Sequence, residues 1–153
     1  MSSLSESSAA RDLAHRPFWR RWLTVWCWAV GLFGVVLLGG AFTATNGPVR
    51  MVVELMNGPQ AFDAGPQARF SLALMGAVSL GWALTLAAAF EAAGQLGAQG
   101  GRIWRRITVG IVAWFVIDST LSIATGYGLN AVPNLVFIAA YLLPVMRMGL
   151  LKG

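Results

Sequence analysis

The stretch ITVGIVAWFVIDSTLSI, residues 107–123, decides the fold because it is apolar enough to cross a membrane and yet contains a carboxylic acid, Asp118. An acidic side chain inside a membrane helix costs about 2.5 kcal/mol or more on insertion scales unless neighbouring groups compensate it. We therefore interpret this stretch as a membrane span and Asp118 as the centre of a polar site. Other segments of the chain must then supply the compensating groups.

The composition of the whole chain agrees with this interpretation. Of the 153 residues, 57% are hydrophobic and only 11% are charged, whereas about a quarter of the residues of soluble domains are charged. About 20 helical residues cross a ~30 Å hydrocarbon core. The sequence therefore predicts an all-α membrane protein, a four-transmembrane-helix bundle rather than a soluble protein with buried helices, with spans near residues 22–42, 70–90, 107–125 and 132–150.

The chain divides into a short tail and one domain. Residues 1–16 are rich in Ser and Ala and are expected to form a mobile cytoplasmic tail, and residues 17–153 are expected to form a single transmembrane domain. The first apolar run is too long for a typical signal-peptide core, so we expect it to stay as a span. Near residues 49–57, Arg50 and Glu54 have i,i+4 spacing among apolar residues, which predicts a short helix on the outer membrane surface.

The cations set the expected orientation. Only Arg50 and Arg69 lie between the first two spans, and the other nine flank the opposite ends of the spans: Arg11, Arg16, Arg20, Arg21, Arg102, Arg105, Arg106, Arg147 and Lys152. Loops rich in Lys and Arg stay cytoplasmic. We therefore expect a multi-pass protein of the cell inner membrane with both termini in the cytoplasm. Membrane lipids suffice as partners for the net charge of +5, and we expect no nucleic-acid partner.

Several kinds of chemistry lack support in the sequence. Cys27 is the single cysteine, which excludes an intramolecular disulfide, and the single histidine, His15, lies outside every expected span. The six acidic residues are scattered along the chain. We therefore expect no metal site, no cofactor and no catalytic residue pair.

Polar side chains gather around Asp118 when the third span is drawn as a helix. Asp118, Ser122 and Thr125 share one face, with Ser119 beside it. A short loop then leads to the fourth span, which therefore forms an antiparallel hairpin with the third. Asn130 and Asn134 begin that span, and Asn130 is a candidate helix cap. The spacing predicts a polar pocket about 10 Å below the outer end of the third span.

The charge of Asp118 can be neutralised in two ways, by an arginine or by a proton. Arg69 lies at the outer mouth of the second span, and we expect it to pair with Asp118, while Arg50 pairs with Glu54. The alternative is a proton held by Asp118 itself and donated to a neighbouring oxygen. The candidate pocket residues are therefore Asp118, Ser119, Ser122, Thr125, Asn130, Asn134 and Arg69.

Three functions fit these features. The favoured one is a structural or accessory subunit that packs with itself as a homo-oligomer or within a larger membrane complex. The second is a transport-like protein that binds a proton, an ion or a small ligand through Asp118. The third, least favoured, is an enzyme that acts on a lipid or quinone in the outer leaflet with Asp118 as acid or base. The sequence favours a protein without enzymatic activity.

Overall fold

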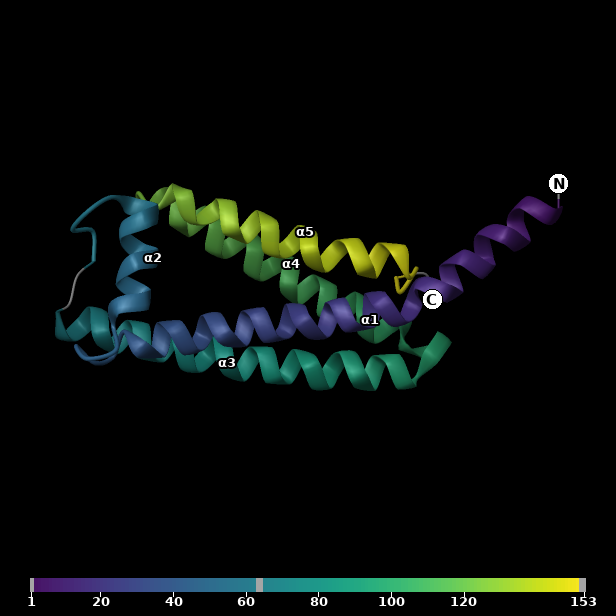
Figure 1. Cartoon of the computed structure of the whole chain (residues 1–153), viewed down its shortest axis with the longest axis horizontal. Coiled ribbons are helices and arrows are strands. Elements are labelled where there is room, and N and C mark those ends of the chain that lie inside the picture. The colour runs from purple at the N-terminus through teal and green to yellow at the C-terminus, as the bar shows by residue number, and fades with distance from the viewer. Residues whose placement is uncertain (1, 63–64, 152–153) are drawn as a thin grey trace.

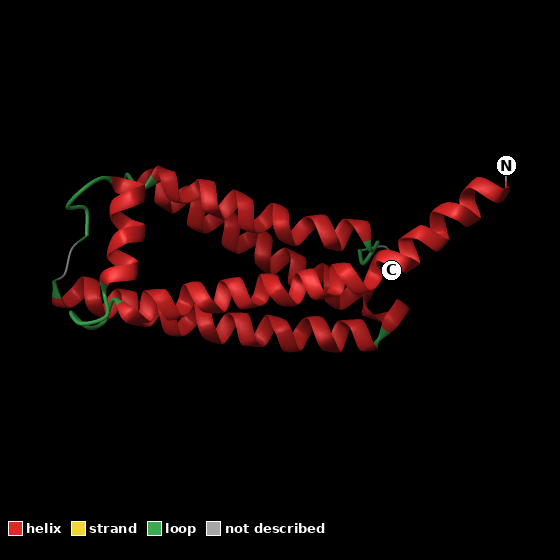
Figure 2. Ribbon diagram, in the orientation of Figure 1, coloured by secondary structure: helices red, strands yellow, loops and turns green. Residues whose placement is uncertain are grey.

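The computed structural model describes residues 2–62 and 65–151, with side chains described from residue 17 onward except at residue 98. This part of the chain consists of helices and connecting turns, without strands (Figure 2). The elements are α1 (Ser2–Gly39), α2 (Gly47–Asn57), α3 (Pro66–Gln95), η1 (Gly97–Gly100), α4 (Gly101–Ala124), η2 (Gly128–Asn130) and α5 (Ala131–Arg147). The tail expected over residues 1–16 lies outside the residues whose side chains are described, and its mobility stays a prediction.

Four helical segments in the described chain are long and apolar enough to cross a membrane: Pro17–Gly39, Pro66–Gln95, Gly101–Ala124 and Gly128–Arg147. They run alternately up and down, so both chain termini lie at one end of the bundle (Figure 1). We call this the terminal end and the opposite one the α2 end. The predicted four-helix membrane bundle is confirmed.

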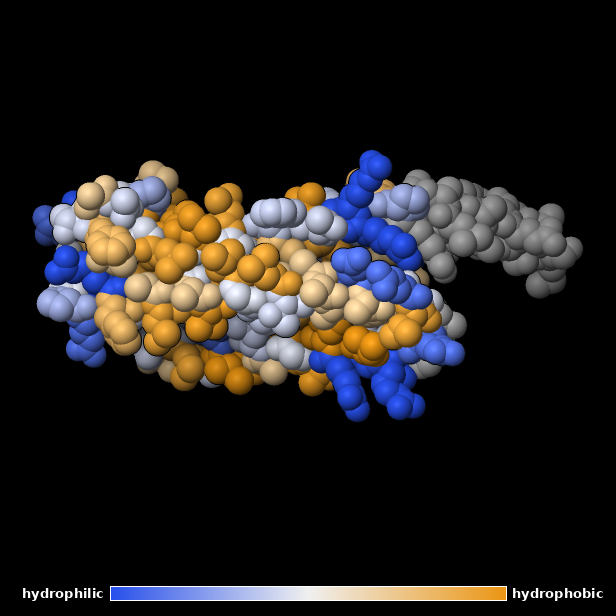
Figure 3. Space-filling model, turned by 90° about the horizontal axis from the view of Figure 1, so that it is seen from below, coloured by the Kyte–Doolittle hydropathy of each residue, from blue (hydrophilic) through white to orange (hydrophobic). Residues whose placement is uncertain are grey.

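The surface has the distribution that a membrane requires. Apolar side chains cover the middle of the face in Figure 3, and hydrophilic side chains gather toward its two ends. Large apolar side chains stand fully outward, among them Trp28, which is 72% exposed. Contiguous apolar surface of this kind is rare on soluble monomers and is typical of membrane-spanning helices.

Two glycines bring α1 and α3 into backbone contact. A Cβ on Gly76 would lie 2.5 Å from the backbone nitrogen of Leu38 and 2.6 Å from the carbonyl oxygen of Gly34. A Cβ on Gly34 would in turn lie 2.9 Å from the carbonyl oxygen of Gly76. Small residues permit such close approach between membrane helices. Gly34 and Gly76 therefore set the distance between α1 and α3.

Aromatic rings fill the bundle toward the terminal end. The indole ring of Trp26 is central: its centroid lies 5.6 Å from that of Tyr141 and within 6.4 Å of three further rings, those of Trp82, Phe90 and Phe137. Phe90 also stacks on Trp104, with the centroids 5.1 Å apart. These rings come from all four long helices, so the contacts join the helices to one another. Aromatic pairs at such distances add stability beyond their buried area.

Helix α5 is fixed to α1 by two indole N–H groups. Pro144 has no backbone N–H, so the carbonyl of Ala140 lacks its usual donor four residues later. Trp22 Nε1 donates to that oxygen at 2.8 Å. Trp26 Nε1 donates to the carbonyl oxygen of Phe137 at 2.9 Å. The helix irregularity that proline creates is thus compensated by the neighbouring helix.

At the other end, α2 lies across the bundle and reaches from α1 to η2 (Figure 1). Its first turn contains Pro48, and Gly58 directly follows its last residue, with a φ of 94° that suits glycine. Arg50 Nε bonds Glu54 Oε1 at 2.9 Å, as the sequence predicts. The expected short helix near residues 49–57 is confirmed, and Val49 on it is fully buried.

Candidate functional site

The centre of the site is the carboxylate of Asp118 on α4. Its Oδ2 atom accepts hydrogen bonds from Asn130 Nδ2, at 3.1 Å, and from Asn134 Nδ2. Each amide group also donates its second N–H to a serine of α4: Asn130 to Ser122 Oγ at 2.9 Å and Asn134 to Ser119 Oγ at 3.2 Å. The structure therefore brings five of the seven expected site residues together.

These five residues fasten α4 to the start of α5. Asp118, Ser119 and Ser122 share one side of α4, and the two asparagines are four residues apart, one turn along the facing helix. Ser119 and Asn134 are buried, whereas Asp118, Ser122 and Asn130 are half-buried. Every fully buried side-chain nitrogen or oxygen in the described chain has a hydrogen-bond partner. The cluster therefore leaves no fully buried polar side-chain atom of the described chain without a partner.

The other two expected site residues do not join this cluster. Thr125 Oγ1 donates to the backbone oxygen of Leu121 at 2.8 Å, a bond within its own helix. Arg69 Nη1 donates to Thr43 Oγ1 at 3.4 Å. The expected ion pair between Arg69 and Asp118 is therefore wrong. Arg69 lies in the first turn of α3, beside the loop that follows α1, and a cavity separates α3 from Asp118.

Asn130 also differs from its expected role as a helix cap. It occupies the N-cap position of α5, but its side chain makes no capping bond. Its amide instead bonds Asp118 and Ser122. A carboxylate attracts an amide N–H more strongly than a neutral acceptor does, which explains why this side chain turns toward α4.

A cavity of about 590 Å³ lies between α1, α3 and α4 and extends under α2. Most of its wall is apolar: Phe33 and Leu37 of α1, Val49, Val52, Val53 and Met56 of α2, and Leu72 and Met75 of α3. Most of its polar lining lies on the side of α4 and the turn after it, where Asp118, Ser122, Thr125 and Asn130 contribute, and Asn57 of α2 and Ser71 of α3 add polar groups on the other walls. The arrangement is that of a small-molecule pocket, an apolar concavity with a few convergent polar groups.

Among the residues that the structure describes, no cation is paired with the carboxylate. Within the described chain Asp118 forms no ion pair, and only Oδ2 has a hydrogen-bond partner. The residue lies six positions before the end of α4, about 9 Å of helix below that end. When ionised, an acidic group beside an apolar cavity and bonded only to neutral amides within the described chain attracts a cation that enters the cavity.

The sequence did not reveal the walls of this cavity. We expected a pocket between the third and fourth spans, whereas the cavity is bounded by α1, α2 and α3 on the sides away from Asp118. The sequence feature that could indicate this wall is the apolar face of residues 49–57. The sequence predicts that this face lies on the membrane surface, whereas Val49, Val52, Val53 and Met56 line the cavity.

Comparisons of the chain with protein-family models, with curated proteins and with solved structures find no match. The chemistry of the site is therefore argued from its groups. One carboxylate can hold a cation or a proton, the amides and hydroxyls orient it, and the apolar walls accept a hydrocarbon body. These properties favour binding of an amphipathic ligand.

Proposed function

We propose that this small integral membrane protein binds a lipophilic organic cation in the cavity at the α2 end, with Asp118 as the counter-charge. The observation that carries the proposal is a carboxylate that lines an apolar cavity and has amide donors but no cationic partner in the described chain. This proposal develops the small-ligand alternative that the sequence allows.

The size and polarity of the cavity support this ligand class. Pockets for small molecules measure about 300–1,000 Å³, and this one falls within that range at about 590 Å³. An apolar body would cover the side chains of α1, α2 and α3, while the positive group would approach Asp118 Oδ1. The two asparagine amides fix the carboxylate through Oδ2, so it is oriented before the ligand binds.

A purely structural or accessory role makes a different prediction for Asp118. Hydrogen bonding across the hairpin needs only an acceptor, and an asparagine at this position keeps an acceptor oxygen without a charge. A carboxylate adds the cost of placing a charge in the membrane. Ligand binding explains the charge, whereas interhelical hydrogen bonding alone does not require it.

The test is binding of tetraphenylphosphonium to the purified protein in lipid nanodiscs, measured by equilibrium dialysis. We expect saturable binding to the wild type and at least tenfold weaker binding, about 1.4 kcal/mol, to Asp118→Asn. The matched control is Glu54→Gln, which removes a carboxylate at the same end of the bundle but outside the cavity. A neutral ligand of similar shape, triphenylphosphine oxide, should bind both proteins alike. Equal affinity of wild type and Asp118→Asn for the cation would refute the proposal.

The location of the protein is part of the same proposal. We place the terminal end in the cytoplasm of a cell with this protein in its inner membrane, supported by six arginines near that end: Arg20, Arg21, Arg102, Arg105, Arg106 and Arg147. The cavity then opens toward the outer leaflet. A single cysteine introduced at the exposed loop residue Pro59 in a Cys27→Ser protein should react with an impermeant maleimide added outside intact cells. Reaction only after lysis would show the opposite orientation, with the α2 end in the cytoplasm.

A further inference from the structure

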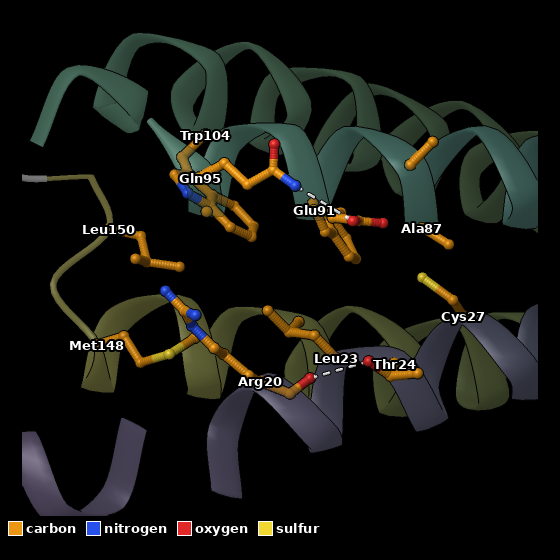
Figure 4. A pocket seen from close by; sticks show the side chains of 13 residues that line it. Arg20, Leu23, Thr24, Cys27, Ala87, Glu91, Gln95, Trp104, Met148 and Leu150 are labelled. Carbon is orange, nitrogen blue, oxygen red and sulfur yellow. Dashed lines mark hydrogen bonds between the residues drawn. The ribbon is translucent and has the colours of Figure 1, made fainter. Parts of the chain in front are cut away.

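A second cavity, of about 690 Å³, lies at the terminal end and takes no part in the function proposed above. It is bounded by α1, α3, the first turn of α4 and the segment after α5. Figure 4 shows Arg20, Thr24 and Cys27 on one side of it and Ala87, Glu91 and Gln95 on the other, with Trp104 and Leu150 near one end. The lining of this cavity includes one cationic side chain, Arg20, and one anionic side chain, Glu91.

The two charged side chains are not paired with each other. Arg20 and Glu91 line the same cavity, but neither belongs to an ion pair within the described chain. Glu91 Oε1 accepts a hydrogen bond from Gln95 Nε2 at 3.2 Å. The guanidinium of Arg20 approaches α3 at Gly94, where an added Cβ would lie 3.9 Å from Nη2. The opposite charges are therefore held on two facing helices, each with free hydrogen-bonding capacity.

The polarity of the cavity changes with depth. Arg20, Glu91 and Gln95 are exposed and lie where α1 enters and α3 leaves the apolar part of the bundle. Cys27 is seven residues farther along α1 than Arg20, about 10 Å deeper. Leu23 and Phe90 line the cavity next to the charged side chains, and Ala87 and Cys27 line it deeper in the bundle, whereas Trp104, Met148 and Leu150 lie at its terminal end (Figure 4). The cavity thus leads from charged side chains near its terminal end to an apolar lining along α1 and α3, as a lipid headgroup leads to its acyl chains.

We propose that this cavity binds a zwitterionic phospholipid whose headgroup carries a phosphate and a primary ammonium, that is, a phosphatidylethanolamine. Arg20 donates to the phosphate, because the guanidinium fork matches phosphate oxygens. Glu91 accepts from the ammonium, and the upper part of an acyl chain lies on Leu23 and Phe90. An anionic phosphatidylglycerol satisfies only Arg20, and a choline headgroup has no N–H to donate to Glu91.

Native mass spectrometry of the detergent-purified protein tests this site with three dioleoyl lipids added separately: phosphatidylethanolamine, phosphatidylglycerol and phosphatidylcholine. We expect the wild type to retain phosphatidylethanolamine about fivefold better than either other lipid, in line with the additional charge-assisted bond. Soluble phosphoethanolamine should not displace it, because the acyl chain contributes to binding. Equal retention of all three lipids, tighter binding of phosphatidylglycerol, or displacement by the soluble headgroup would overturn the proposal.

Single substitutions distinguish the contributions of Arg20 and Glu91 to lipid retention. Arg20→Gln should weaken retention of phosphatidylethanolamine and phosphatidylglycerol alike, whereas Glu91→Gln should abolish the preference between them and leave phosphatidylglycerol bound. Gly94→Leu should block the mouth by displacing the guanidinium of Arg20. The matched control is Arg21→Gln, because Arg21 is the neighbouring arginine and does not line the cavity. Identical lipid retention by Arg20→Gln and Arg21→Gln would contradict the assignment.

Discussion

The two ends of the bundle are built from different interactions. Toward the terminal end, rings of α3 and α5 pack around Trp26 of α1, Trp104 of α4 stacks on Phe90, and two indole N–H groups bond the backbone of α5. At the α2 end, the α4–α5 hairpin is held by a carboxylate, two amides and two hydroxyls beside a cavity that α2 covers. The aromatic contacts stabilise the bundle beside the cavity of the terminal end, whose two charged side chains, Arg20 and Glu91, are exposed. The polar contacts stabilise the hairpin and leave a half-buried carboxylate, without a cationic partner in the described chain, at the wall of the other cavity.

Loss of the contact between α1 and α3 should lower the stability of both ends of the bundle more than any other change proposed below. In Gly76→Leu the new side chain has no space, because even its Cβ would lie 2.5 Å from the backbone nitrogen of Leu38. Overpacking against backbone should lower the free energy of unfolding by about 3 kcal/mol or more. Gly81→Leu on the same helix is the control, since a Cβ there meets nothing within 4 Å. Circular dichroism during unfolding in mixed micelles measures the free energy of unfolding of both variants. Similar losses of stability in Gly76→Leu and Gly81→Leu would refute the close contact.

Asn134→Leu tests how far the polar cluster holds the α2 end together. The variant removes the donors to Asp118 and Ser119 from a buried position. We expect a loss of about 1–3 kcal/mol in unfolding free energy, measured in the same micelle titration. Val136→Leu, at an exposed position of the same helix, should change it little. If Asn134→Leu is as stable as the wild type, the cluster contributes nothing to the hairpin.

Trp22→Phe tests the corresponding bond toward the terminal end. The carbonyl oxygen of Ala140 loses its indole donor, and Pro144 cannot replace it. We expect a loss of about 1–2 kcal/mol. In a Pro144→Ala background a backbone N–H becomes available, so the same substitution should cost less. A double-mutant cycle measures this coupling, and strictly additive effects would show that the indole bond does not compensate for the proline.

The smallest effect is expected for the ion pair on α2. Arg50→Gln removes the exposed bond to Glu54 and should change the unfolding free energy by less than ~0.5 kcal/mol. Binding of tetraphenylphosphonium should stay within about twofold of the wild type, because Arg50 does not line the cavity. A large loss of binding in this variant would show that α2 depends on the pair for its position.

The sequence predicts the elements of this fold better than their contacts. Span length and apolar content indicate the four long helices, and the i,i+4 pair of Arg50 and Glu54 marks α2. Local spacing also indicates that Asp118 and the two asparagines meet, because a short loop joins their helices. The absence of an Arg69–Asp118 pair depends on the distance between α3 and α4, which no local pattern encodes.

Other features depend on pairs of residues far apart in the chain. The small residue Gly76 indicates a close helix contact, but its partner Gly34 on α1 is evident only from the packed helices. The donation from Trp22 to the carbonyl of Ala140 joins residues 118 positions apart. Both cavities likewise have walls from three or more segments, so composition and periodicity do not reveal them.

The most direct test of the central claim asks whether a cation shields the cavity wall only when Asp118 is present. Thr125 lines the cavity and is not bonded to Asp118, so Thr125→Cys in a Cys27→Ser protein places a thiol there without removing the carboxylate. We predict that tetraphenylphosphonium slows the reaction of this thiol with a methanethiosulfonate reagent at least about tenfold, and that Asp118→Asn abolishes the protection. Equal protection with and without the carboxylate, or no protection in either protein, would contradict the account.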